Sequence, residues 1–152
     1  MNIPRSRSVT LLDREIHYME WGERGAKPLI MGHGLARTGR DFDDIAQELA
    51  SEYHIIVPDT IGRGLSQWSP QPEKEYCYDF YAAFAKALLD KIGFDKVDWI
   101  GTSMGRATAI RAAADPLSGR IKRFVINDIG PEAASAAVER IRFLCRQAAA
   151  LR

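Results

Sequence analysis

Residues 97–114 read VDWIGTSMGRATAIRAAA, and this stretch decides the fold of the chain. The apolar run Val97–Ile100 is typical of a buried strand, whereas Met104–Ala114 is a small-residue segment typical of a helix. Between them, Gly101–Gly105 matches the pattern G-x-S-x-G, in which a serine occupies a sharp strand-to-helix turn. We therefore predict that Ser103 lies on a strained turn, where the two motif glycines leave space for strand and helix to approach. A serine that only caps the helix is the alternative interpretation.

The order of elements along the chain predicts an α/β fold. An antiparallel hairpin comes first, because apolar and polar residues alternate on both sides of the turn Leu12–Arg14. Apolar runs then alternate with segments of helical periodicity, which favours a mostly parallel sheet with helices on both faces. Residues 58–76 show neither period and are predicted to form a long loop. The predicted strands are Pro28–Met31, His54–Val57, Val97–Ile100 and Ile121–Asn127, and the predicted helices are Phe42–Leu49, Phe80–Ile92, Met104–Ala114 and Pro131–Arg152.

The composition argues against several classes of partner. The 21 Lys and Arg residues are balanced by 20 Asp and Glu residues, so no net field recruits nucleic acid or an anionic membrane. Cys77 and Cys145 lack metal-ligand spacing, which predicts free buried thiols and neither a metal nor another cofactor. Because Met1–Thr10 has arginines without an apolar segment behind them, we expect a cytoplasmic protein that acts on a small molecule.

The loop after the first buried strand contains His33, Gly34 and Leu35. In an architecture of this kind, that loop supplies one backbone amide of an oxyanion hole, and the residue after the nucleophile supplies the other. We therefore predict that the N–H groups of Leu35 and Met104 stabilise negative charge on a substrate oxygen. For His33, shaping this loop through hydrogen bonds to the backbone is favoured over acting as a general base.

These motifs resemble those of the α/β-hydrolase superfamily in order and spacing, and the likeness extends over the whole chain. It rests on the loop after the first buried strand, on Pro58–Ser66 after the next strand, and on the turn at Ser103. Within the superfamily, Gly34–Phe42 and Asn127–Glu132 look like segments of esterase-like and C–C-hydrolase-like members. The resemblance implies an α/β-hydrolase fold and a hydrolase activity without fixing the substrate.

The resemblance also implies which residues are architectural. In this family, Pro58–Ser66 mainly supports the fold. Gly62 and Gly64 would serve turns, and Asp59 would bond local amides. Neither Asp59 nor Arg63 is therefore given a catalytic role.

The family's order of catalytic residues bears on which part of a hydrolase this chain represents. In the family the nucleophile is followed by an acid and then by a histidine. All three histidines of the chain precede Ser103, namely His17, His33 and His54. The resemblance therefore implies that residues 1–130 are the N-terminal portion of the hydrolase core, truncated before the last strands. Residues 131–152 would begin a cap-like helical segment.

Two positions leave alternatives open. Asp128 follows the predicted strand Ile121–Asn127, where it is either the catalytic acid or an Asx-turn residue before Gly130. Arg106 stands where family members often carry a second glycine, so close packing of the helix against the sheet is in question.

From these motifs, the best hypothesis is that the protein is a serine hydrolase, which cleaves an ester or related acyl substrate through an acyl-enzyme. A longer chain or another polypeptide would supply its histidine. A truncated, inactive remnant or a small-molecule-binding domain is the alternative, and Arg106 favours it. Nucleotide binding at Gly34–Asp41 is disfavoured, because Arg40 and Asp41 replace the lysine and hydroxyl of a phosphate-binding loop.

We also expect self-association, since the strand through Phe124–Ile126 leaves an open sheet edge.

Overall fold

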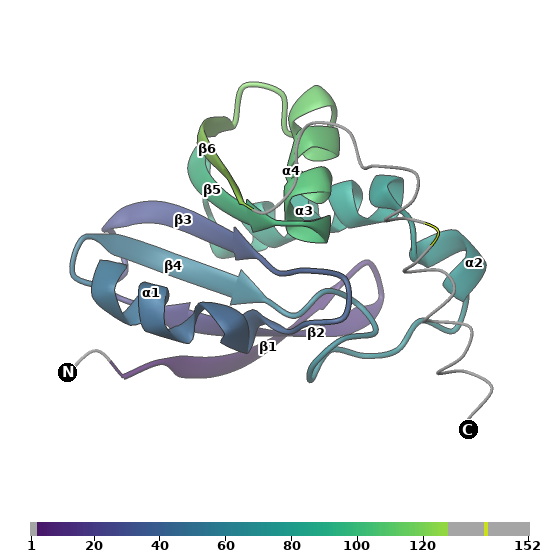
Figure 1. Cartoon of the computed structure of the whole chain (residues 1–152), viewed down its shortest axis with the longest axis horizontal. Helices are drawn as coiled ribbons and strands as arrows, with labels where there is room; N and C mark the ends of the chain where they lie inside the picture. The colour runs from purple at the N-terminus through teal and green to yellow at the C-terminus, as the bar shows by residue number, and fades with distance from the viewer. Residues whose placement is uncertain (1–2, 128–138, 140–152) are drawn as a thin grey trace.

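The computed structural model describes residues 3–127 and residue 139, and its centre is a six-stranded sheet. The strand order is β1-β2-β4-β3-β5-β6 (Figure 1). β1 pairs antiparallel with β2, and β2 pairs antiparallel with β4, whereas all pairs among β3, β4, β5 and β6 are parallel. The predicted α/β fold with an N-terminal hairpin is confirmed. The strands are β1 Arg5–Leu11, β2 Arg14–Trp21, β3 Lys27–Gly32, β4 Tyr53–Pro58, β5 Val97–Thr102 and β6 Ile121–Asn127.

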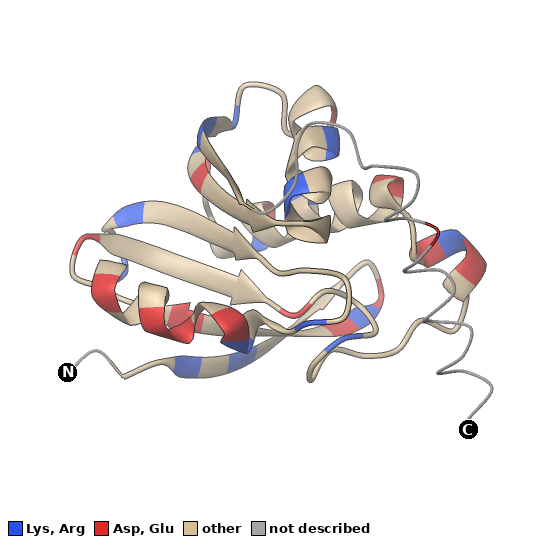
Figure 2. Ribbon diagram, in the orientation of Figure 1, with Lys and Arg blue, Asp and Glu red and all other residues tan. Residues whose placement is uncertain are grey.

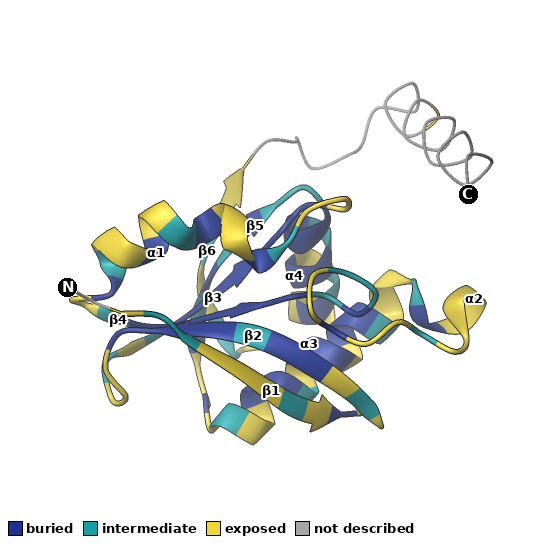
Figure 3. Ribbon diagram, turned by 90° about the horizontal axis from the view of Figure 1, so that it is seen from below, coloured by how far each residue is buried: buried dark blue, intermediate teal, exposed yellow. Residues whose placement is uncertain are grey.

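Helices cover both faces of the sheet, as the alternating order of elements predicts. α1 lies on one face, and α3 and α4 lie on the other (Figure 3). α3 ends where Gly93 adopts a left-handed conformation with φ of 86°, which favours glycine. All helices within residues 3–127 are too short or too polar to traverse a bilayer. The helices are the 3₁₀ turn η1 Gly39–Phe42, α1 Asp43–Leu49, α2 Pro72–Glu75, α3 Tyr78–Ile92 and α4 Met104–Ala114.

Two local expectations for the segment before α3 are wrong. The predicted loop 58–76 contains the four-residue helix α2, which is too short to show a periodic pattern. Cys77, expected to be a buried thiol, is exposed because it occupies the N-cap position at the start of α3. Cys145 and the predicted division at residue 130 lie outside the described residues.

The central strands β3 and β4 are mostly apolar because they are buried on both faces. Along β3, Ile30 faces the cluster under α3 and α4, whereas Leu29 and Met31 face the cluster under α1. β4 repeats this alternation with Ile56 on the first side and Ile55 on the second. Burial on two sides explains why these strands show no polar alternation in the sequence.

Asp59 connects the loops at the carboxyl ends of the strands. It is 3% exposed, and its Oδ1 accepts a hydrogen bond of 2.8 Å from the Gly39 N–H. Its Oδ2 accepts one of 3.0 Å from the Leu65 N–H and lies 2.8 Å from His17 Nδ1. The prediction that Asp59 bonds local amides is confirmed, and these bonds fix the loops beside Ser103's end of the sheet.

Glu20 forms a buried ionic cluster at the other end of the sheet. Its carboxylate is 2% exposed and accepts hydrogen bonds from Arg5 and Arg7 at Oε2 and from Arg24 and His54 at Oε1. Burial alone would raise the pKa of this carboxyl. The hydrogen bonds from His54, Arg24 and Arg7 outweigh burial and lower the pKa from 4.5 to about 2.

We predict that Glu20→Gln removes an acid-sensitive part of the stability. Because the folded pKa lies below the unfolded one, the stabilisation is complete above pH 4.5 and is lost as pH falls towards 2. Urea denaturation at pH 7 should show a free energy of unfolding lower by about 3 kcal/mol in the variant, with the difference shrinking at pH 2.5. Glu52→Gln, which removes an exposed pair with Lys27, is the control and should change it by less than about 1 kcal/mol. A variant with wild-type pH dependence would contradict this account.

Candidate active site

Ser103 occupies the sharp turn between β5 and α4. Its φ of 49° and ψ of −109° place a non-glycine residue in a left-handed region, at a cost of about 1–3 kcal/mol. The side chain makes no capping hydrogen bond to α4, and the residue is half-buried rather than packed inside the core. The predicted strained turn is therefore present, and the interpretation of Ser103 as a simple helix cap fails on its geometry.

Backbone contact between α4 and the sheet holds this turn in place. A Cβ atom added to Gly105 would clash with the carbonyl oxygen of Gly32 in β3. A Cβ atom added to Gly101 would lie 2.6 Å from the Cα atom of Arg106. The Gly105 N–H also donates a hydrogen bond of 3.0 Å to the carbonyl of His33. Only glycine fits at these two positions, so the predicted close approach of strand and helix is observed.

Arg106 does not prevent this close packing. Its side chain is buried in the first turn of α4, at 5% exposure. The contact between α4 and the sheet runs through the backbone of Gly105 and Arg106, so the size of the Arg106 side chain does not enter it.

The loop after β3 passes beside Ser103. A Cβ atom added to Gly34 would lie 3.8 Å from the Ser103 Cβ atom. Within residues 3–127, neither the Leu35 N–H nor the Met104 N–H has a hydrogen-bond acceptor. Both amides are therefore available to an oxygen of a bound molecule. The Met104 amide is at the N-terminus of α4, where the helix dipole also favours negative charge.

Arg63 fixes the loop that contains Leu35, and sequence reasoning missed this role. Its Nε donates a hydrogen bond of 3.1 Å to the carbonyl of Leu35, and its Nη1 donates one of 2.9 Å to the Tyr81 hydroxyl. The guanidinium also lies 5.2 Å from the ring centroid of Tyr76. No local pattern could reveal this contact, because Arg63 and Leu35 are far apart in the sequence.

His33 has both ring nitrogens engaged. Nε2 accepts a hydrogen bond of 3.0 Å from the Thr60 N–H, so Nδ1 carries the proton and donates to the Gly34 carbonyl at 2.7 Å. Burial lowers the pKa of His33 and outweighs the opposing hydrogen bond to Gly34, so the ring is neutral at pH 7. These contacts match a residue that shapes the loop.

The other two histidines also serve the fold. His17 Nδ1 bonds Asp59, and its Nε2 lies 2.8 Å from the hydroxyl of Ser6. His54 Nε2 bonds Glu20 at 2.9 Å. In the described part of the chain, no histidine forms a hydrogen bond with the Ser103 hydroxyl.

The end of β6 meets the turn at Ser103. The carbonyl of Asn127 accepts a hydrogen bond of 3.4 Å from the Ser103 N–H, and the Asn127 side-chain amide donates one of 3.3 Å to the Thr102 hydroxyl. No local pattern of residues predicts this contact, because the parallel pairing of β5 and β6 creates it. Asp128, the candidate acid, follows directly but lies outside the described residues.

The comparison with protein families decides the identity of this fold. The profile of the alpha/beta hydrolase fold family matches residues 27–144, which is most of the chain. The chain belongs to the alpha/beta hydrolase fold family. The match includes the loop after β3 and the turn at Ser103, so the resemblance drawn from these motifs is confirmed.

Individual relatives of this alpha/beta hydrolase support the assignment. The 3-hydroxybutyrate-oligomer hydrolase of Cupriavidus necator is 40% identical over 125 residues, which cover 82% of this chain and 42% of the relative. N-formylmaleamate deformylase of Pseudomonas putida is 35% identical over 112 residues, with coverage of 74% and 40%. The crystal structure of an alpha/beta hydrolase from Novosphingobium aromaticivorans matches with a TM-score of 0.84 at 33% identity, over 93% of this chain and 50% of that one. The chain spans less than half the length of these two curated relatives.

We predict that Gly105→Ala destabilises this alpha/beta hydrolase by about 3 kcal/mol or more, because the added methyl group has no space against Gly32. Urea denaturation measures the effect. Gly34→Ala makes the same chemical change where the nearest atom, Arg37 Cγ, lies at an ordinary 3.5 Å, and it should change the free energy of unfolding by less than about 1 kcal/mol. Wild-type stability in Gly105→Ala would show that the helix does not approach as closely as described.

Proposed function

We propose that the chain carries the nucleophile and oxyanion hole of a serine hydrolase that cleaves an ester or related acyl substrate. One observation supports this above the others. Ser103 is held at a positive φ between β5 and α4, half-exposed, with the Gly34 loop beside it. A strained residue of this kind persists only where its surroundings impose it, and such residues cluster at active sites.

The proposed chemistry proceeds through an acyl-enzyme. Ser103 Oγ attacks the substrate carbonyl carbon while a base accepts the hydroxyl proton. The amides of Leu35 and Met104 stabilise the negative oxygen of the tetrahedral intermediate. The carbon–oxygen bond to the leaving alcohol then breaks, and the protonated base returns its proton to that alcohol. Water attacks the acyl-enzyme by the same route, which releases the acid and restores Ser103.

The base in this proposal is a histidine from outside the chain. His17, His33 and His54 are its only histidines, and each is engaged in contacts that support the fold. Using any of them as a base would break a buried hydrogen bond and leave its partner unsatisfied. The histidine would come from a longer form of the protein or from another polypeptide, and Asp128 would orient it.

An ester fits the substrate side of the proposal. The Cupriavidus relative is named for oligomers of 3-hydroxybutyrate, which are joined by ester bonds. An oxyanion hole made of backbone amides serves any acyl group that passes through a tetrahedral intermediate, so the ester class rests on this relative more than on the site.

A fluorophosphonate probe tests the role of Ser103. We expect a longer form, equal in length to the relatives, to be labelled rapidly at Ser103, because its histidine removes the hydroxyl proton. The 152-residue chain lacks this base and should react more slowly by several orders of magnitude, since losing a triad base costs about 10⁶ in turnover. Mass spectrometry of the intact protein and its peptides locates the label.

Two variants complete this test. Ser103→Ala should abolish labelling of the longer form, whereas Thr102→Ala, one residue away, should keep most of it. Rapid labelling of the 152-residue chain would show that it holds its own base. Labelling that survives Ser103→Ala would place the nucleophile elsewhere, and a longer form that never reacts would favour an inactive remnant or a binding domain.

We also propose that the 152-residue chain associates with itself along β6. Within the described sheet, β6 pairs only with β5, so one side of its backbone lacks a strand partner. Val125 and Ile126 on this strand are 54% and 50% exposed. They line a hollow of about 570 Å³ together with Ile45 of α1. Unpaired strand backbone next to exposed apolar side chains favours pairing with a second copy.

Light scattering across a concentration series checks this association. We expect dimers or larger species whose fraction increases with concentration, and we expect Val125→Lys to shift the equilibrium to monomer by placing a charge on the edge. Thr10→Lys on β1, the opposite edge strand, is the control and should leave the association unchanged. A stable monomer at every concentration would rule the proposal out.

A further inference from the structure

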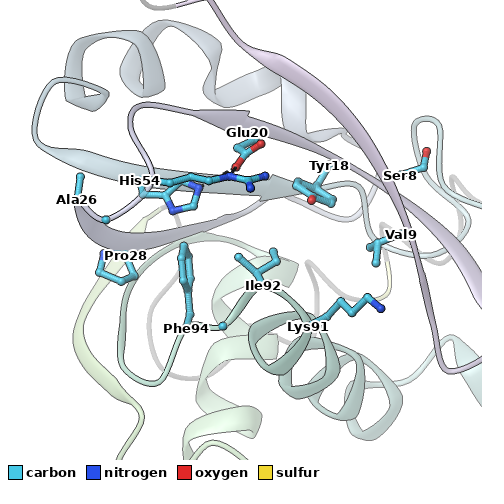
Figure 4. A pocket seen from close by; sticks show the side chains of 13 residues that line it. Ser8, Val9, Tyr18, Glu20, Ala26, Pro28, His54, Lys91, Ile92 and Phe94 are labelled. Carbon is cyan, nitrogen blue, oxygen red and sulfur yellow. Dashed lines mark hydrogen bonds and ion pairs between the residues drawn. The ribbon is translucent and has the colours of Figure 1, made fainter.

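A second cavity lies on the α3 side of the sheet, far from Ser103. It has a volume of about 530 Å³ and opens between the β1–β2 hairpin, the start of β4 and the end of α3 (Figure 4). Figure 4 shows Tyr18 and His54 facing Ile92 and Phe94 across this space. The volume falls within the range of about 300–1,000 Å³ typical of small-molecule sites.

This cavity is separate from the candidate active site. It is lined by Pro28 and His54, which lie near the starts of β3 and β4. Ser103 follows the end of β5, which runs parallel to β3. In neighbouring parallel strands, all starts lie along one side of the sheet and all ends along the other. The cavity and Ser103 are therefore on opposite sides of the molecule.

The charges around the cavity favour an anion. Arg24 and Lys91 line the cavity together with the single carboxylate of Glu20. Arg5 and Arg7 do not line it, but both bond the Glu20 carboxylate. Lys91 has no ion pair within residues 3–127, and Figure 2 shows basic residues along β1. The lining therefore has two cations and one carboxylate, an excess of one positive charge. The negative end of the α3 dipole contributes only about half a charge and does not reverse this excess.

Hydrocarbon and polar groups share the walls of the cavity. Phe94 packs edge-on against the His54 ring at 5.0 Å between ring centroids. Val9, Pro28 and Ile92 supply the other hydrocarbon surfaces, and the Tyr18 hydroxyl and the Ser8 hydroxyl are available as hydrogen-bond donors. Cations and hydrocarbon groups that line one space suit a molecule with an anionic head and a hydrocarbon body.

We propose that this cavity binds a small amphiphilic carboxylate, with its head on Arg24 and its hydrocarbon body against Ile92, Val9 and Phe94, while Lys91 adds positive charge to the lining. Arg24 uses its Nε on Glu20, so its terminal nitrogens remain to bond a ligand carboxylate. This inference is independent of the proposed hydrolase activity, because none of the residues near Ser103 takes part in it.

Isothermal titration calorimetry with octanoate tests the ligand class. We expect saturable binding of one octanoate per chain. Acetate shares the head without the hydrocarbon body, and octyltrimethylammonium shares the hydrocarbon body with the opposite charge. Both should bind at least about tenfold more weakly. Failure of octanoate to bind, or equal binding of the cationic amphiphile, would overturn the proposal.

Matched variants locate the binding. Lys91→Gln and Arg24→Gln should each weaken octanoate binding by about tenfold, and both side chains are exposed enough to be replaced without unfolding the chain. Lys86→Gln on the same helix is the control, because Lys86 pairs with Asp90 and does not line the cavity. Ile45→Gln on the α1 side tests the other exposed hollow. Unchanged affinity in both cavity variants, or an equal loss in either control, would place the binding elsewhere.

Discussion

The contact between the first turn of α4 and the end of β3 is the constraint on which the candidate active site depends. Gly105 bonds the carbonyl of His33, and neither Gly105 nor Gly101 has room for a side chain. Because α4 and β3 are this close, the backbone between β5 and α4 must change direction within a single residue. Ser103 therefore adopts φ of 49°, and the energy of this strained conformation is supplied by packing elsewhere in the core.

Contacts between distant residues then hold the surrounding loops against this turn. Asp59 joins the loops at residues 39 and 65, Arg63 bonds the carbonyl of Leu35, and Asn127 bonds the Ser103 N–H. The Asp59–Gly39 and Arg63–Leu35 contacts join the loop after β4 to the loop after β3, and the Asn127 contact joins the end of β6 to the turn after β5. Loops that carry chemistry become rigid in this way without secondary structure of their own, which keeps donors in place before a charge develops.

Charged side chains have different partners at the two ends of the central strands. At the carboxyl ends of the strands, Asp59 and Arg63 bond backbone groups of the loops near the Ser103 hydroxyl. Within residues 3–127, the amides of Leu35 and Met104 have no acceptor there. At the opposite ends of β3 and β4, Glu20 is buried among arginines beside the second cavity. A buried carboxylate such as Glu20 requires charged partners to remain ionised.

The sequence by itself determined the order of elements, the strained turn and the end of α3. These features depend on neighbouring residues, through apolar periodicity, the glycines around Ser103 and the left-handed conformation of Gly93. The tertiary structure alone decided the contacts of Arg63 and Asn127, the ionic cluster of Glu20 and the exposure of Cys77. Their partners are brought together by strand order and loop packing, so no local pattern of side chains records them.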